Sequence, residues 1–86
     1  MTDEITVQLF GAFRDYDPSG KTEIAYRDNM TALDIKESLI KRLGGGASLE
    51  RLISMSALAD DETIYRDDAP IEKNKTLAIL PPVAGG

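Results

Sequence analysis

The chain begins with a stretch in which hydrophobic and polar residues alternate one by one. The apolar members of this stretch are Ile5, Val7 and Leu9. A period of two is typical of a strand with one buried face, so the sequence predicts a strand over residues 5–9. Turn-forming residues at 15–20 then lead to a second predicted strand over residues 22–26.

From Thr31 onward the apolar residues recur three or four positions apart, which is the period of a helix. They are Ala32, Ile35, Leu39 and Leu43, with Leu33 and Ile40 widening the stripe. Thr31 and Asp34 have the spacing of a capping box, in which each side chain satisfies a free amide of the first turn. Gly44 follows, and glycine readily takes the left-handed conformation that ends a helix. The sequence therefore predicts a helix between Thr31 and Gly44.

Three shorter strands are predicted after the glycines, over residues 53–58, 63–65 and 76–80. Pro70 has no amide hydrogen to donate and marks a break before the last strand, and Pro81 ends that strand. We therefore expect an α+β fold, with a mixed sheet of four to five strands and one main helix packed on one face.

Composition narrows the classes of function. The chain has 86 residues, of which 42% are hydrophobic and 29% are charged, as expected for one small globular domain. It contains no cysteine and no histidine, so a thiolate nucleophile, a zinc ribbon and a histidine proton shuttle are excluded, and no metal site is expected. The formal net charge of −5 disfavours nucleic acid and anionic membranes as partners. An acidic start without a long apolar segment predicts a cytoplasmic protein.

Two short motifs resemble ligand-binding loops but lack a residue that the ligand requires. Residues 20–22 resemble the end of a phosphate-binding loop, yet Asp15 stands where that loop needs a glycine. Residues 15–20 resemble the start of a calcium loop, yet Tyr26 stands where a bidentate glutamate is needed. We interpret residues 15–20 as a turn, and the carboxylates at residues 60–62 as a second turn exposed to water.

The last six residues carry the strongest functional signal. Residues 81–86 read Pro-Pro-Val-Ala-Gly-Gly and contain no charged side chain. The two prolines hold the backbone extended, and the two glycines leave the end narrow enough to enter a channel in another protein. We therefore interpret residues 1–80 as a folded domain and residues 81–86 as an extended tail that presents the carboxylate of Gly86.

This ending resembles the C-terminus of the ubiquitin-like sulfur carriers, and most closely that of the small subunit of molybdopterin synthase. Other segments resemble the same family: Val7, Phe10, Gly11 and Arg14 near its first strand, Thr31, Ala32, Ile35 and Leu39 in its helix, and Pro70, Ile71, Asn74 and Leu77 before its last strand. The chain departs from the family at Asn74-Lys75, where Gly-Asp is usual, but asparagine can take the same left-handed conformation. The resemblance implies a ubiquitin-like β-grasp fold.

The resemblance also implies a carrier and not an enzyme. An adenylyltransferase similar to ubiquitin-activating enzymes would use ATP to activate the carboxylate of Gly86, and a sulfur donor would convert it to a thiocarboxylate. The tail would then enter the large subunit of molybdopterin synthase and donate its sulfur to the dithiolene of molybdopterin. The chain itself would bind no cofactor. The residues expected to contact the partner along the tail are Gly85, Ala84, Val83, Pro82 and Pro81.

Strand alternation adds a second expected contact surface beside the tail. If Ile5, Val7 and Leu9 face the helix, Phe10 faces the other side of the sheet, and the same reasoning turns Leu80 outward. The first and last strands are neighbours in a β-grasp sheet. We therefore predict that Phe10 and Leu80 form an exposed apolar patch that docks on a partner.

Three other functions stay open on the sequence. The chain could be a ubiquitin-like modifier that is joined to target lysines through Gly86. It could carry sulfur for thiamine or another thio-metabolite, although the Pro-Pro pair is unusual for a thiamine carrier. It could also be an interaction module whose Gly-Gly end has no chemical role.

Overall fold

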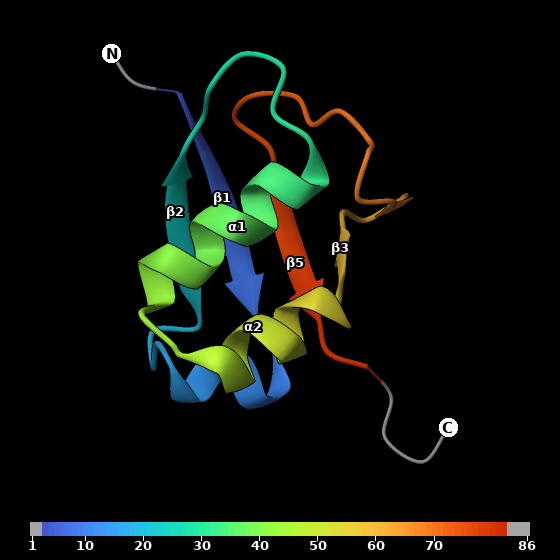
Figure 1. Cartoon of the computed structure of the whole chain (residues 1–86). Coiled ribbons are helices and arrows are strands. Elements are labelled where there is room, and N and C mark those ends of the chain that lie inside the picture. The colour runs from blue at the N-terminus through green and yellow to red at the C-terminus, as the bar shows by residue number, and fades with distance from the viewer. Residues whose placement is uncertain (1–2, 83–86) are drawn as a thin grey trace.

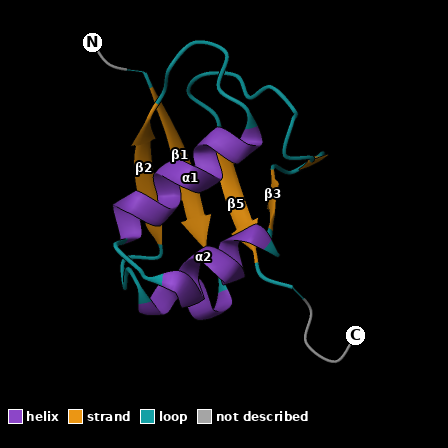
Figure 2. Cartoon of the chain, in the orientation of Figure 1, coloured by secondary structure: helices purple, strands orange, loops and turns teal. Residues whose placement is uncertain are grey.

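Residues 3–82, the part of the chain that the computed structural model describes, form five β-strands, two α-helices and one short 3-10 helix (Figure 1). In chain order the elements are β1 (Glu4–Leu9), η1 (Gly11–Asp15), β2 (Lys21–Ala25), α1 (Ala32–Leu43), α2 (Ala47–Ser54), β3 (Ala57–Ala59), β4 (Ile64–Tyr65) and β5 (Thr76–Leu80). The strands of this part of the chain make one sheet in the order β2-β1-β5-β3-β4. The two α-helices cover one face of the sheet (Figure 2).

The central strands bury one face, as their alternation predicts. Ile5, Val7 and Leu9 of β1 are buried, and so are Leu77 and Ile79 of β5. Strands β1 and β5 are parallel, whereas β1–β2, β3–β5 and β3–β4 are antiparallel, so the sheet is mixed. The predicted α+β architecture is confirmed, with the core between this buried face and the two helices.

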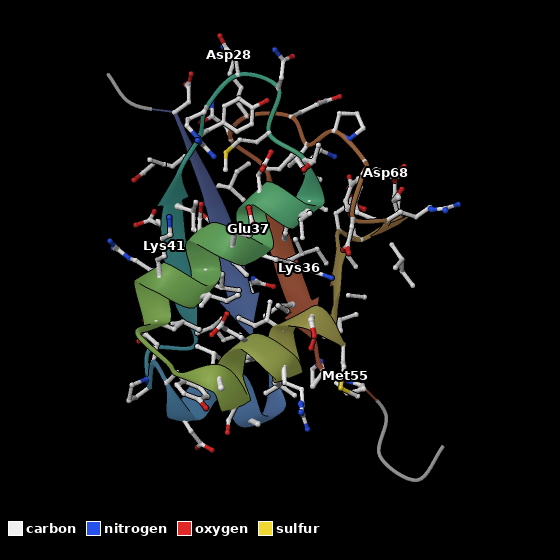
Figure 3. The ribbon with its side chains drawn as sticks, viewed as in Figure 1. Asp28, Lys36, Glu37, Lys41, Met55 and Asp68 are labelled. Atoms are coloured by element: carbon white, nitrogen blue, oxygen red, sulfur yellow. The ribbon has the colours of Figure 1, made fainter. Side chains whose placement is uncertain are left out.

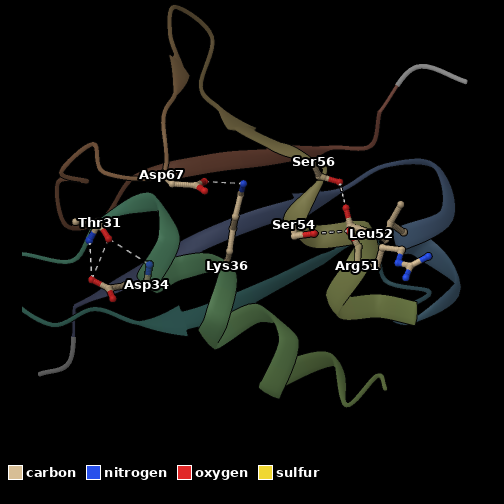
Figure 4. Close-up of polar contacts among 8 residues, drawn as sticks. All are labelled: Thr31, Asp34, Lys36, Arg51, Leu52, Ser54, Ser56 and Asp67. Carbon is tan, nitrogen blue, oxygen red and sulfur yellow. Dashed lines mark hydrogen bonds and ion pairs between the residues drawn. The ribbon is translucent and has the colours of Figure 1, made fainter. Parts of the chain in front are cut away.

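Helix α1 begins and ends as the sequence predicts. The Thr31 hydroxyl accepts a hydrogen bond from the amide of Asp34, and the Asp34 carboxylate accepts one from the amide of Thr31 at 2.9 Å (Figure 4). Gly44 follows the helix with φ +70°, in the left-handed region. The capping box and the glycine stop are confirmed.

The apolar stripe of α1 differs from the prediction at one position. Leu33 is 45% exposed and does not join the core. Lys36 instead has a side chain only 7% exposed, and its ammonium pairs with the Asp67 carboxylate at 2.8 Å (Figure 4). The long aliphatic part of the lysine packs along the helix surface while the charge reaches the segment before β5.

The predicted strand over residues 53–58 is wrong. Residues 47–54 form helix α2, and the strand in this region is the three-residue β3. Leu49 and Ile53, four positions apart, both point into the core from α2. Gly45 has no room for a side chain, because a Cβ there would collide with Leu49. Leu49, Leu52 and Ile53 have the three- and four-residue spacing of a helix, so Ile53 belongs to α2 and not to a strand.

The loops follow the turn predictions. The amide and the hydroxyl of Ser19 both donate to the Asp17 carboxylate, at 3.1 and 2.8 Å, which makes residues 15–20 a turn that leads into β2. Asn74 has φ +62°, the left-handed conformation expected for it, immediately before β5. Its side-chain oxygen accepts a hydrogen bond from the amide of Glu4 at 3.3 Å, which links the turn to the start of β1. Among the helices of residues 3–82, none is long and apolar enough to cross a membrane.

Candidate functional site

The end of β5 lies beside the end of β1. Leu9 pairs with Ile79 in the parallel register, so the next residues along the two strands are Phe10 and Leu80. Both side chains belong to the face of the sheet that the helices leave open, and they are 45% and 38% exposed. The expected placement of these two residues is therefore found. Their docking role stays a prediction.

The chain turns sharply after Phe10, and this turn supports the root of the tail. Gly11 has φ +59° and begins the 3-10 helix η1, which the sequence did not predict. Phe13 of this helix is completely buried, so η1 is anchored in the core. A Cβ built on Gly11 would lie 3.2 Å from Cγ of Pro81, so a side chain here would push Pro81 away by a few tenths of an ångström.

The tail residues named from the sequence divide into two groups. Pro81 is half-buried against Gly11, and Pro82 is exposed. The other four positions, Val83, Ala84, Gly85 and Gly86, lie outside the residues that the structure describes. Their roles, and the division into a domain of residues 1–80 and a tail of residues 81–86, stay predictions.

Two exposed apolar residues near this site were missed by the sequence analysis. Ile64 is 70% exposed and pairs with Ala59, which in turn pairs with Ala78, so Ile64 shares the open face of the sheet with Leu80. Met55 is also exposed, and Figure 3 shows it beside the end of β5. An apolar residue at the centre of a charged hairpin was the signal for Ile64. Met55 lay inside the wrongly predicted strand.

A polar cluster holds the hairpin that carries Ile64. The carboxylate of Asp60 accepts hydrogen bonds from the amides of Glu62 and Thr63, at 2.8 and 2.7 Å, and from the hydroxyl of Tyr65. The ammonium of Lys75 completes the set at 3.0 Å. Asp60 therefore closes the β3–β4 turn and ties it to the residue before β5. The predicted turn is confirmed, but the Asp60 side chain is only 9% exposed, so its predicted exposure to water is wrong.

The cluster shifts the protonation of its own members. The hydroxyl of Tyr65, the amide of Glu62 and the ammonium of Lys75 hold the pKa of Asp60 well below its usual range. The Asp60 carboxylate, followed by the Tyr65 hydroxyl, raises the pKa of Lys75, and Asp60 also raises the pKa of Tyr65. The cluster is charged and fully paired at neutral pH, which suits a structural role.

The described residues offer surfaces for binding. Among residues 3–82, no three acidic side chains lie close enough together to hold a metal ion. Phe10 and Leu80 instead place exposed apolar side chains at the end of β5, on the open face of the sheet, where the chain continues into Pro81 and Pro82. Such an arrangement can dock a protein surface and direct the following residues toward it.

Comparison with known proteins identifies the fold and the family. The ThiS family model matches residues 7–86 of the chain. Small archaeal modifier protein 1 from Haloferax volcanii is 16% identical, with TM-score 0.74, over 93% of this chain and 98% of that one. Molybdopterin converting factor, subunit 1, from Pyrococcus furiosus is 18% identical, with TM-score 0.69, over 93% of this chain and 98% of that one.

A third solved structure extends the likeness to ubiquitin-like domains. The UBL domain of Plasmodium falciparum Dsk2 is 12% identical, with TM-score 0.64, over 95% of this chain and 100% of that one. A search of curated protein sequences finds no match. The fold is therefore the ubiquitin-like β-grasp that the sequence predicts.

Proposed function

Because the chain belongs to the ThiS family of ubiquitin-like sulfur carriers, we propose that it carries sulfur on its C-terminal glycine as the small subunit of a molybdopterin synthase. The observation that carries this proposal is the anchored root of the tail. Pro81 packs on Gly11 at the edge of an exposed apolar patch, and the family match continues from there through Gly86. The likeness to a molybdopterin converting factor subunit supports this choice of pathway.

The proposed chemistry begins at the carboxylate of Gly86. A carboxylate is a poor electrophile because it is anionic, so one of its oxygens first attacks the α-phosphorus of ATP in the activating enzyme and pyrophosphate leaves. Sulfide, or an equivalent sulfur donor, then attacks the carbonyl carbon of the acyl-adenylate. The C–O bond to AMP breaks, AMP leaves, and a thiocarboxylate remains. In the large subunit this sulfur bonds to a carbon of the molybdopterin precursor, water then cleaves the acyl C–S bond, and the carboxylate of Gly86 is restored.

The geometry at Pro81 suits delivery of this group. Proline restricts its own backbone and that of the preceding residue, so Pro81 and Pro82 favour an extended exit from β5. Six residues beyond Leu80 span at most about 20 Å, which is long enough to enter a neighbouring active site. The glycines at the end avoid steric conflict around the activated carbonyl. The cofactor chemistry would thus take place in the partner, with this chain supplying the reacting group.

The open-face patch supplies the docking surface in this proposal. Phe10, Leu80 and Ile64 are exposed on the same face of the sheet as the tail root. The patch is apolar, whereas the chain as a whole carries a net charge of −5. The activating enzyme and the large subunit would each cover this patch while they hold the tail.

One alternative is favoured by a specific observation. The likeness to small archaeal modifier protein 1 is as close as the likeness to the molybdopterin factor subunit. A modifier would use the same adenylate but would join Gly86 to lysine side chains. Heavier conjugates in a cell extract, removed by deletion of Gly86, would support this alternative.

Deletion of Gly86 tests the need for carboxyl-terminal chemistry. The shortened chain should keep the melting temperature of the full chain, because the deletion lies beyond β5, yet it should fail to form an adenylate in an ATP–pyrophosphate exchange assay. Gly86→Ala is the matched control for chain length, and it should retain part of the exchange. Full sulfur transfer by the shortened chain would overturn the proposal.

A further inference from the structure

A hollow of about 410 Å³ lies on the open face of the sheet, the face that the helices do not cover (Figure 2). The strand register explains its position. Ala78 of β5 pairs with Gln8 on one side and with Ala59 on the other, and Ala59 pairs in turn with Ile64. Each of the two alanines carries only a methyl group, so the centre of this row is lower than its ends at Gln8 and Ile64.

One side of the hollow is continuous with the open-face patch. Leu80 lies two residues beyond Ala78 on the same face of β5, about 7 Å along the strand, and it is exposed together with Phe10. Ile64 closes the end of the hollow at the hairpin and is exposed as well. A protein that covers the patch therefore also covers the hollow.

The opposite side of the hollow is polar, because Asp60, Asp61 and Thr76 line it there. Asp61 and Thr76 each lie two residues from the Ala59–Ala78 pair, in the direction away from the tail. The antiparallel register thus brings the two side chains to the same end of the hollow. A carboxylate and a hydroxyl offer neighbouring acceptors there, beside a floor of methyl groups.

Asp61 carries the charge that is left for a partner. The Asp60 carboxylate is already occupied by the ammonium of Lys75, at 3.0 Å, and by the hydroxyl of Tyr65. Asp61 is exposed, and within residues 3–82 no lysine or arginine nitrogen lies within 4.0 Å of its carboxylate. A cation from outside can therefore pair with Asp61 without displacing another.

The other charges around the hollow leave this end acidic. Glu62 follows Asp61 in the hairpin and is exposed, and Arg66 beyond β4 is a single positive charge against these two carboxylates. On β2, Lys21 and Glu23 face the same side of the sheet with opposite charges. Lys21 also lines a separate depression together with Arg14, toward β2. The cations of this face thus lie mainly away from Asp61.

These features select a long side chain with a cation at its end. Arginine and lysine lay their aliphatic stems along apolar surface and keep the charge at the tip. Arginine is the better fit, because its planar guanidinium donates several hydrogen bonds at once. It can meet the Asp61 carboxylate and the Thr76 hydroxyl together.

We propose that the hollow receives an arginine side chain of the activating enzyme, whose stem lies on Ala59 and Ala78 and whose guanidinium binds Asp61 and Thr76. This inference deepens the proposed function and rests on one step of it, the adenylation of Gly86. The activating enzyme is the partner because a sulfur carrier and a modifier both begin with that step. Asp61 then helps to determine which activating enzyme accepts the chain.

Charge variants test the contact in the ATP–pyrophosphate exchange assay, with the concentration of the full chain varied. Asp61→Asn should raise the KM for the chain by about threefold or more, and Asp61→Lys by about tenfold or more. The kcat should stay the same, because Asp61 lies outside the tail that reacts. Asp28→Lys is the matched control and should keep the wild-type KM, since Asp28 is exposed at the opposite end of the molecule from the tail (Figure 3).

The salt dependence of KM is a second readout, which a merely structural role of Asp61 would not change. Salt screens the attraction between exposed opposite charges. The KM of the wild-type chain should therefore rise more steeply with NaCl concentration than the KM of Asp61→Asn. Equal slopes would overturn the ion pair and the proposal with it.

A steric variant tests the floor of the hollow. Ala78→Val adds two methyl groups to the floor, and valine is favoured in strands, so the melting temperature should not fall. The KM should rise by about threefold or more, because the stem of the arginine loses its place. Ala25→Val is the matched control, since Ala25 is exposed at the end of β2 and does not line the hollow.

The same assay separates failure of this inference from failure of the proposed function. An unchanged KM in Asp61→Lys or in Ala78→Val would overturn the inference, and so would an equal rise in the matched control of either variant. In those cases exchange with the wild-type chain would still support the adenylation of Gly86. No exchange with the wild-type chain would overturn that adenylation, and this inference with it.

Discussion

Gly11 lies directly against the ring of Pro81, so close that a Cβ on Gly11 would be 3.2 Å from Cγ of the proline. The two residues are seventy positions apart in the sequence, and the parallel pairing of β1 with β5 brings them together. The contact fixes the point at which the chain leaves the sheet. The left-handed conformation of Gly11 therefore affects the position of Pro81, the first residue of the tail.

Gly11→Ala tests this contact. The left-handed φ of +59° and the approach of Pro81 both oppose a side chain here, so we expect a loss of about 1–2 kcal/mol in the free energy of unfolding. Gly44→Ala is the control, because Gly44 has φ +70° but nothing within 4 Å of a built Cβ. Both variants should lose stability in chemical denaturation, and Gly11→Ala should lose more, because its side chain also meets Pro81. Only Gly11→Ala should slow sulfur transfer at a temperature where both are folded, and equal rates would contradict a role for the contact.

Substitutions in the open-face patch should weaken docking without unfolding the chain. Phe10→Ser and Leu80→Ser remove exposed apolar surface, and each should reduce affinity for the large subunit by about tenfold or more. Leu33→Ser is the matched control, because Leu33 is exposed to the same extent as Phe10 but lies on α1. Isothermal titration calorimetry measures all three. Unchanged affinity in both patch variants would remove the patch from the account.

The Asp60 cluster predicts an acid limb in the stability profile, that is, a fall in the free energy of unfolding as the pH drops below about 4. The folded pKa of Asp60 is lowered, so the unfolded chain binds a proton there more readily than the folded chain does. The stabilisation is therefore present above the unfolded pKa of about 4 and is lost as the pH falls below it. Asp60→Asn should be less stable at neutral pH and should lose less further stability between about pH 7 and pH 3.

Asp61→Asn is the control, because it removes a carboxylate from the same turn without removing a member of the cluster. Asp61 is exposed and takes no part in the hydrogen bonds of the cluster. Its variant should keep both the neutral stability and the acid limb of the wild-type chain, measured by thermal unfolding across the same pH range. An acid limb of wild-type steepness in Asp60→Asn would contradict the assignment.

Local sequence signals predicted a structural feature correctly where a single residue type has a clear local cause. The capping box of Thr31, the left-handed turn at Asn74 and the burial of alternate residues in β1 and β5 all follow from such signals. Helix α2 was missed although Leu49, Leu52 and Ile53 have the spacing of a helix, because Ile53 was assigned to a strand. Leu49 and Ile53 are buried in the core on the inner side of this helix.

The candidate site was predictable only in the part that depends on strand alternation. Phe10 and Leu80 follow from the period of two and the pairing of β1 with β5. Ile64 depends on the register of the short hairpin with β3, and Met55 on the end of an unpredicted helix. The packing of Pro81 on Gly11 joins the two ends of the chain, so no local pattern reveals it.

Sulfur loading at Gly86 is measured by intact-mass spectrometry of the full chain, incubated with its activating enzyme, ATP and sulfide. We expect a mass increase equal to the replacement of one oxygen by sulfur, located by fragmentation at Gly86, dependent on ATP and absent from the chain that lacks Gly86. Efficient sulfur transfer by a chain whose Gly86 carboxylate stays unmodified throughout the reaction would contradict it.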